Sequence, residues 1–211
     1  MTARKQDLDH LLDQARTTLP GSSDAGLKGN LFDVFHEFFN DSNAWVETIS
    51  VPIIPGSVDY NIVPSSGQII RLAGVLDQNQ LPISALMPEV GVLHLMSPVN
   101  IAQPYAVVVV KNVKFPTDRH SIPDVPEWVL PLYGRTILSG LLGKMKGQPS
   151  KTYSDKTGSV FDLAQFKDGI ALAKIATFRR NAIGAQAWGF PQTFRTRGQR
   201  GGVSVGNPVQ F

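Results

Sequence analysis

The four histidines are the residues best suited to acid–base or metal chemistry, but their spacing keeps them apart. His10 and His36 fall in two different predicted helices, His94 falls in a predicted strand, and His120 falls in a loop. No HExxH or other metal-binding spacing joins them. His36 beside Glu37 is the best acid–base pair, yet adjacent residues of a helix point in different directions. We therefore expect ordinary surface or half-buried histidines.

Other catalytic motifs are also missing from the sequence. It contains no GxSxG, no GxxxxGK[ST] and no GxGxxG opening a helix, and the absence of cysteine excludes thiolate ligands and nucleophiles. The carboxylates Asp7, Asp9 and Asp13 lie near a predicted helix start, where negative charge suits the helix dipole. We expect no catalytic, cofactor-binding or metal-binding residues and no enzymatic activity.

The charges divide the chain into two unlike parts. Residues 1–168 hold 14 Lys and Arg with all 17 Asp and Glu, whereas residues 169–211 hold six basic residues and no acidic one. This asymmetry indicates an anionic partner, either nucleic acid or an acidic protein surface. No apolar run is long enough to cross a membrane, and the first residues lack the apolar core of a signal peptide. We expect a soluble protein made in the cytoplasm.

The stretch 122–186 predicts two long helices joined by a short polar link. Asp124 and Glu127 have capping-box spacing, so the first helix is expected to begin there, with Pro126 in its opening turn. Gly147 and Pro149 end it. One face of the second helix should be apolar: Val160, Leu163, Phe166, Ile170, Ala173, Ala176 and Thr177. Charged residues should lie mostly off that face: Asp162, Lys167, Asp168, Lys174 and Arg179. The short link favours an antiparallel hairpin.

Two shorter helices are predicted before this hairpin. Residues 4–18 have the spacing of a short helix with one apolar face, and Pro20-Gly21 prevents that helix from continuing. Ser23 or Asp24 can cap the next helix, whose apolar stripe is rich in aromatic residues. That stripe consists of Leu27, Leu31, Val34, Phe35, Phe38 and Phe39. A helix this short cannot bury so much apolar surface by itself, so we expect it to pack against the later helices.

Between the helical regions the apolar residues alternate, which predicts strands over residues 45–115. The expected strands are 45–53, 58–63, 68–76, 81–86, 92–96 and 105–113. Short strands separated by turn residues are typical of an antiparallel sandwich or small barrel. The run Ala106–Val110 is apolar on both faces, so we expect a central position for it.

The predicted fold is therefore α+β. Residues 1–43 and 120–186 form a helical bundle, residues 44–119 form an inserted antiparallel β-sandwich or barrel, and residues 187–211 form an extended arm. The arm contains Gly198, Gly201, Gly202 and Gly206, which disfavour a helix. Its aromatic start and apolar end indicate that it docks on a partner.

The order of these elements, with several motifs, resembles the head-to-tail adaptor (tail tubular or gatekeeper) proteins of short-tailed double-stranded DNA phages. The similarity covers most of residues 120–195. It lies in Pro126-Glu-Trp-Val129, Tyr133, Ile137–Leu142, Met145, Gln148-Pro149, Tyr153-Ser-Asp155, Phe166, Gly169-Ile170, Ala173 and Arg180-Asn181. In that family a Pro-Glu helix, a Gln-Pro stop and a Ser-Asp-capped linker precede a long helix.

This resemblance implies a structural virion protein at the head–tail junction, made in the bacterial host cytoplasm. The subunits would form a homo-oligomeric ring, expected to be a dodecamer, with the portal protein above, the tail nozzle protein below and double-stranded DNA passing through the lumen. No cofactor, metal or membrane is implied. The C-terminal arm would bind the portal through Trp188, Phe190, Phe194, Arg195, Arg197, Arg200, Val203, Val205 and Phe211.

Two other functions remain open from the residues alone. The basic arm could bind nucleic acid, with bases stacking on its aromatic residues, or it could simply be a disordered solubilising tail. The β domain could instead bind a host sugar at the end of a helical stalk. That hypothesis requires Trp45, Tyr60 and Tyr105 to be exposed, whereas we expect most of them in the core or in an interface.

Overall fold

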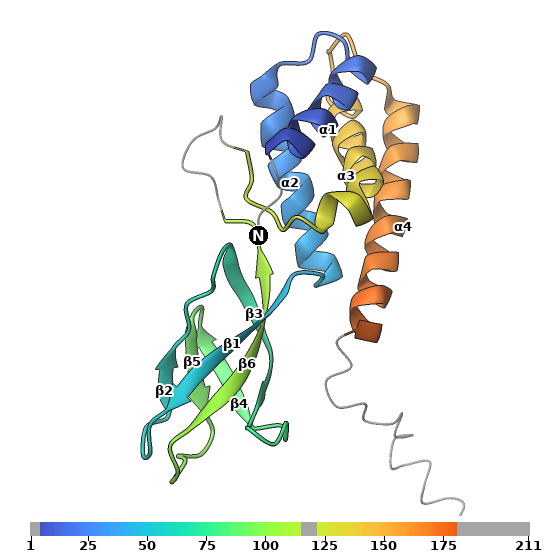
Figure 1. Ribbon diagram of the computed structural model, residues 1–211. Coiled ribbons are helices and arrows are strands. Elements are labelled where there is room, and N and C mark those ends of the chain that lie inside the picture. The colour runs from blue at the N-terminus through green and yellow to red at the C-terminus, as the bar shows by residue number, and fades with distance from the viewer. Residues whose placement is uncertain (1–4, 115–121, 181–211) are drawn as a thin grey trace, which may run out of the picture. The chain divides into compact units, whose positions relative to one another are not determined.

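The computed structural model of the protein describes residues 5–114 and 122–180, which form a mixed α+β structure with antiparallel sheets (Figure 1). The elements in these ranges are α1 (Lys5–Thr18), α2 (Asp24–Ser42), β1 (Val46–Ile53), β2 (Asp59–Asn61), β3 (Gln68–Leu76), β4 (Ala85–Glu89), β5 (Val92–Leu95), β6 (Gln103–Asn112), α3 (Val129–Lys146) and α4 (Lys156–Arg180). The predicted fold class is confirmed. No helix among the described residues is both long and apolar enough to span a membrane.

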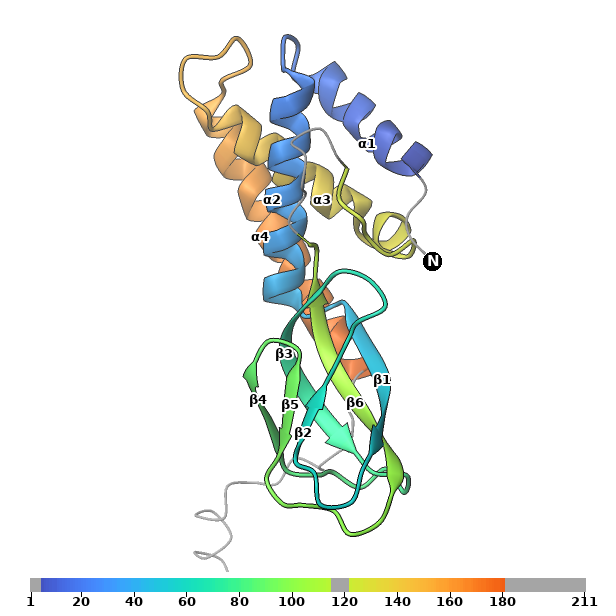
Figure 2. The ribbon, with the colours of Figure 1, turned by 90° about the vertical axis from the view of Figure 1, so that its left-hand side faces the viewer.

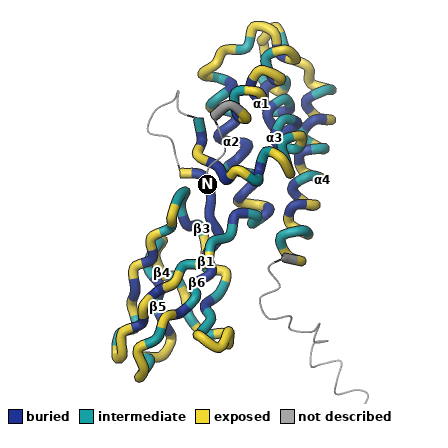
Figure 3. The backbone as a smooth tube through the Cα atoms, in the orientation of Figure 1, coloured by how far each residue is buried: buried dark blue, intermediate teal, exposed yellow. Residues whose placement is uncertain are grey.

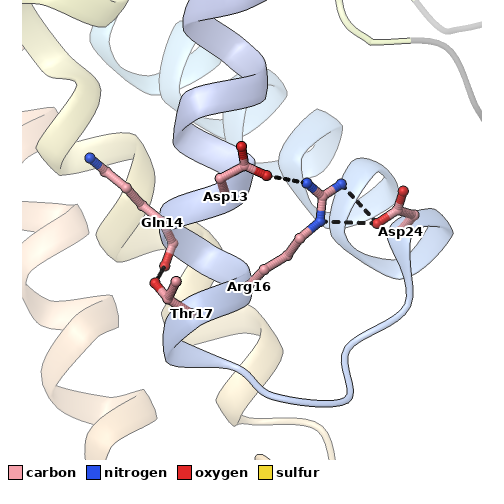
Figure 4. A network of polar contacts seen from close by, with 5 residues as sticks. All are labelled: Asp13, Gln14, Arg16, Thr17 and Asp24. Atoms are coloured by element: carbon pink, nitrogen blue, oxygen red, sulfur yellow. Dashed lines mark hydrogen bonds and ion pairs between the residues drawn. The ribbon is translucent and has the colours of Figure 1, made fainter.

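Helix α2 begins where its sequence predicts. The Ser23 hydroxyl accepts a hydrogen bond from the N–H of Gly26 at 3.2 Å, which satisfies one of the free donors of the first turn. Every residue of the predicted apolar stripe is buried. Arg16 near the end of α1 bonds to Asp13 and to Asp24, the first residue of α2, with Nη2 to Oδ1 of Asp24 at 2.8 Å (Figure 4). This contact ties the two N-terminal helices together.

Helix α3 begins at Val129 rather than near Asp124, so the predicted capping box is wrong. Residues that precede a proline avoid the helical conformation, and Pro126 follows Val125 directly. Val125 is buried in the helical core, and the N–H of Val129 bonds to the carbonyl of Pro126 at 3.1 Å. The stretch before α3 therefore contributes a core side chain instead of a first helical turn.

Helices α3 and α4 form the predicted antiparallel hairpin, and glycine lets them approach closely. A Cβ atom on Gly140 would lie 2.8 Å from the Phe166 ring, and one on Gly143 would lie 2.8 Å from Cγ of Leu163. Gly147, the residue that caps the end of α3, faces Ser159 near the start of α4 in the same way. Side chains at these positions would push the two helices apart.

The strands form two three-stranded antiparallel sheets, with strand orders β1-β6-β3 and β2-β5-β4. The central position of β6 confirms the expectation for its valine run. The predicted strand 81–86 is misplaced, because β4 occupies Ala85–Glu89 and Pro82 makes only an isolated bridge to Leu76. Pro82 has no N–H to donate, which explains why regular pairing begins later. Strand β2 is also shorter than the predicted 58–63.

Two hydrophobic clusters hold these elements. The helical cluster joins all four helices and contains the large aromatic side chains of α2, with the Phe38 and Tyr133 ring centroids 5.1 Å apart. The second cluster takes side chains from both sheets. Between them, the Asn112 side chain at the end of β6 donates a hydrogen bond to the His36 carbonyl of α2 at 3.0 Å. Helix α3 contacts each of the other three helices, and their arrangement can be followed in Figures 1 and 2.

Candidate assembly surface

The most unusual described surface is the outward side of α4, which exposes large apolar side chains. Five of them are between 50% and 76% exposed: Val160, Phe161, Leu172, Ile175 and Phe178. Exposed positions run along the whole helix in Figure 3. A helix that packs on only one side normally has polar residues on the other, so this helix has apolar groups on two sides. The last three, Leu172, Ile175 and Phe178, are neighbours at helical spacing, and contiguous exposed apolar groups mark interaction sites.

This arrangement corrects the predicted faces of α4. Val160 was expected on the packed face but is 65% exposed. Asp162 was expected off it but is buried, and its Oδ2 atom lies 2.8 Å from Nζ of Lys146 on α3. The Ser159 hydroxyl also faces α3 and donates to the Gly143 carbonyl at 2.7 Å. The start of α4 is therefore held by polar contacts, which leaves Val160 and Phe161 outside.

The exposed charges of α4 are mostly positive. Lys156, Lys167, Lys174 and Arg179 are exposed, and Asp168 is the exposed acidic residue of this helix. Asp168 has no ion-pair partner among the residues that the structure describes. Helix α1, in contrast, exposes a negative charge near its start, at Asp7.

A cleft of about 450 Å³ runs between α1 and the first half of α3. Its lining is largely apolar and includes Leu11, Leu130, Pro131 and Leu138. The polar and charged residues at the cleft are Asp7, His10, Gln14 and Arg135. Apolar grooves of this kind are typical receptors for an amphipathic helix.

A second cleft has a mixed polar and apolar lining and lies over a buried ion pair. Nζ of Lys111 donates to Oε2 of Glu47 at 2.8 Å and lies 4.6 Å from the centroid of the Trp45 ring. Burial raises the pKa of the Glu47 carboxyl, but hydrogen bonds from Lys111 and Ser65 together with the nearby ammonium bring it below its ordinary value of 4.5. The carboxylate is therefore ionised at neutral pH and balances Lys111, which makes this cleft a structural feature.

A third cleft, of about 780 Å³, is lined mostly by polar and charged residues and lies where α2, β3 and α4 meet. Arg71 from β3 reaches into this region and donates to the carbonyl of Asn40 at 2.9 Å and to the side chain of Asn43. Lysines 167 and 174 of α4 line the same cleft beside Glu37 and Asp41. Mixed charge and wide access give no single ligand chemistry here.

Among the candidate acid–base residues, one pair was missed from the sequence. His94 on β5 and Asp59 on β2 are cross-strand neighbours, with Nδ1 of His94 2.6 Å from Oδ1 of Asp59. Recognising the pair requires the strand register, which no local motif supplies. Neither residue lines any of the three clefts described above, and His10 is bonded to the nearby Gln14 side chain. No group of potential metal ligands occurs within the described ranges.

The aromatic residues on which the sugar-binding hypothesis depends are all buried. Trp45, Tyr60 and Tyr105 are each less than 10% exposed. The Tyr60 hydroxyl donates within the β domain, to the Ser57 carbonyl at 2.9 Å. Rings that are covered by their own chain cannot stack on a sugar, so that hypothesis loses the residues it needs.

The predicted portal-binding residues lie outside the described part of the chain. They are Trp188, Phe190, Phe194, Arg195, Arg197, Arg200, Val203, Val205 and Phe211. His120 lies outside it as well.

No protein-family model and no curated protein matches the sequence. The outward side of α4 and the α1–α3 cleft are therefore the surfaces on which a function can be built.

Proposed function

We propose that this chain is a head-to-tail adaptor of a short-tailed double-stranded DNA phage, a structural protein that forms a ring between the portal and the tail nozzle. The observation that carries the proposal is the outward side of α4, which exposes Leu172, Ile175 and Phe178 to water. Three large apolar side chains on successive turns of one helix are costly to leave uncovered. A partner subunit that covers them accounts for their presence.

The hairpin region supports the same proposal through its local structure. Gln148 and Pro149 follow the end of α3, and α4 begins directly after Asp155. Oδ1 of Asp155 accepts the N–H of Gly158 at 2.9 Å, so Asp155 caps α4 as the family motif expects. Gln148 and Pro149 therefore mark the end of α3, and Asp155 marks the start of α4.

In this proposal the segment after α4 binds the portal. Residues 187–211 combine arginine with apolar side chains and with glycine, and ordering such a segment costs roughly 1–2 kcal/mol per residue. Apolar anchors and strand addition on the portal can offset this cost, and arginine can form forked contacts with portal carboxylates.

The test is co-purification with the portal protein encoded in the same genome. We expect the full chain to co-purify and a variant lacking residues 199–211 to lose attachment while keeping its helical circular dichroism and melting temperature. Attachment of the truncated variant at full occupancy would contradict the docking role. A triple variant, Arg195→Ala, Arg197→Ala and Arg200→Ala, keeps the apolar anchors and separates their contribution from that of charge.

A DNA-binding role is the alternative that the exposed lysines of α4 favour. Lys167, Lys174 and Arg179 would add to the basic arm, and such binding weakens steeply with salt because counterions are released. Filter binding of duplex DNA by the purified chain, measured from low to high salt, tests this role. Strong salt-dependent binding that the triple arginine variant loses, together with unchanged portal attachment, would favour DNA contact.

A further inference from the structure

We propose that α4 of one subunit docks into the α1–α3 cleft of the next copy of the same chain. The inference deepens the proposed function, on which its ring geometry rests, by naming the two surfaces that meet between neighbouring subunits. The ridge on α4 consists of Leu172, Ile175 and Phe178, with Asp168 one turn before them. The cleft is the one lined by Leu11, Leu130, Pro131 and Leu138.

The two surfaces match in length. The ridge residues recur every three positions and span a little under two turns of α4, about 9 Å along the axis. The cleft is lined from Asp7 to Gln14 on α1, which is about 11 Å of helix. A helix whose apolar side chains recur at such intervals is the usual ligand of an apolar groove between two other helices.

The charges beside the two surfaces are complementary and set a direction. Arg179 lies at the ridge end of α4, whereas Asp7 marks one end of the cleft and Arg135 lies further along it. With the basic end of α4 near Asp7, α4 runs antiparallel to α3 of the next copy and brings Asp168 toward Arg135. Neither Asp168 nor Arg135 has an ion-pair partner among the described residues, so both are available.

The two surfaces belong to different sides of one bundle. Helices α1 and α4 both pack against α2 and α3, but on different sides of them, as Figures 1 and 2 both show. A contact between two different surfaces is heterologous, so after the first contact the pair keeps one free cleft on one subunit and one free ridge on the other. Repetition of such a contact closes into a ring when the rotation permits.

Cross-linking tests this directly because the chain has no cysteine of its own. Ala171→Cys on α4 and Gln14→Cys at the cleft are both exposed positions, and each is made in a separate full-length chain. We expect a short bismaleimide to give a heterodimer from the mixed chains in several-fold excess over either homodimer. Val63→Cys in place of Gln14→Cys is the control, since Val63 is 78% exposed and lies in the β region.

Substitutions on the ridge and the charge pair complete the test. Leu172→Asn should lower the cross-linking yield about tenfold or more, because the side chain no longer gains from leaving water. Val63→Asn should leave it unchanged. Asp168→Arg or Arg135→Glu alone should lower the yield, and combining Asp168→Arg in one chain with Arg135→Glu in the other should restore it.

The result that overturns this pairing is a heterodimer yield no greater than the control at high protein concentration, or one that Leu172→Asn leaves unchanged. Portal co-purification by the same variants separates this outcome from failure of the adaptor role. Portal attachment without the cross-link rejects only the pairing of surfaces. The cross-link without portal attachment rejects the adaptor role and retains a self-associating protein.

Discussion

Nζ of Lys111 lies 2.8 Å from Oε2 of Glu47, and this ammonium is almost completely buried. The pair joins β6 to β1, and Nζ of Lys111 also lies within 3.4 Å of the Ser65 and Ser66 hydroxyls. A charge in this position is tolerated because it has a carboxylate, hydroxyl groups and an aromatic face around it. Removing the Glu47 charge should therefore lower the stability of the fold more than replacing Lys111 with an apolar residue.

Glu47→Gln should lower the free energy of unfolding by about 3 kcal/mol, because it leaves the Lys111 ammonium buried without a counter-charge. Lys111→Met should cost less, since Glu47 is partly exposed and water can solvate it. Urea unfolding followed by circular dichroism measures both. Equal losses for the two variants would contradict the proposed role of the uncompensated ammonium.

The same carboxylate predicts a dependence of stability on acid. The pKa of Glu47 is below 4.5 in the folded protein, so its contribution is present above the unfolded value and is lost as pH falls through the folded one. We expect the free energy of unfolding to fall as pH drops below about 4.5, and Glu47→Gln to make this fall shallower. Denaturation series at several pH values compare the two slopes, and identical slopes would count against Glu47 as a contributor.

Two helical glycines should respond in opposite ways to substitution by alanine, because only one of them lies in a close contact between helices. Gly140→Ala should cost about 1–3 kcal/mol, because its Cβ atom would collide with the buried Phe166 and Val34 side chains. Gly29→Ala in α2 should stabilise by about 0.5–1 kcal/mol, because nothing lies within 4 Å of its Cβ position. Thermal and urea unfolding provide the measurement. A stabilised Gly140→Ala variant would show that the helices can separate freely.

The Lys146–Asp162 pair should couple the end of α3 to the start of α4. Asp162→Asn should destabilise the protein by about 1–3 kcal/mol, since Asp162 is buried and lies 2.8 Å from the lysine. A double-mutant cycle with Lys146→Met isolates the interaction from other effects of each substitution. Additive losses would mean that the two side chains contribute separately.

Local signals in the sequence placed most helices well. In α2, the Ser23 cap and the aromatic stripe agree, so both its start and its buried face were predictable. In α3, the capping-box spacing at Asp124 conflicted with Val125, whose burial depends on packing against distant helices. Tertiary packing decided this conflict, and a spacing rule for the helix start contains no information about it.

The assembly surface was only partly predictable. Leu172, Ile175 and Phe178 have helical spacing, so a second apolar face on α4 could have been recognised from the sequence. Which of the two faces packs against α3 depends on the glycines of α3 and on the Lys146–Asp162 contact, and these meet only in the folded hairpin. The cleft between α1 and α3 likewise has no local signature, because its two sides lie more than a hundred residues apart in the sequence.

The strands that begin and finish the β region are direct neighbours, with Val46 opposite Val110 and the Lys111 N–H bonded to the Trp45 carbonyl at 2.7 Å. A segment whose two ends meet in this way can be shortened, exchanged or grafted elsewhere through a brief connection, without moving the ends of the flanking chain. This portion of the molecule can therefore change in length and sequence while the helices around it stay unchanged.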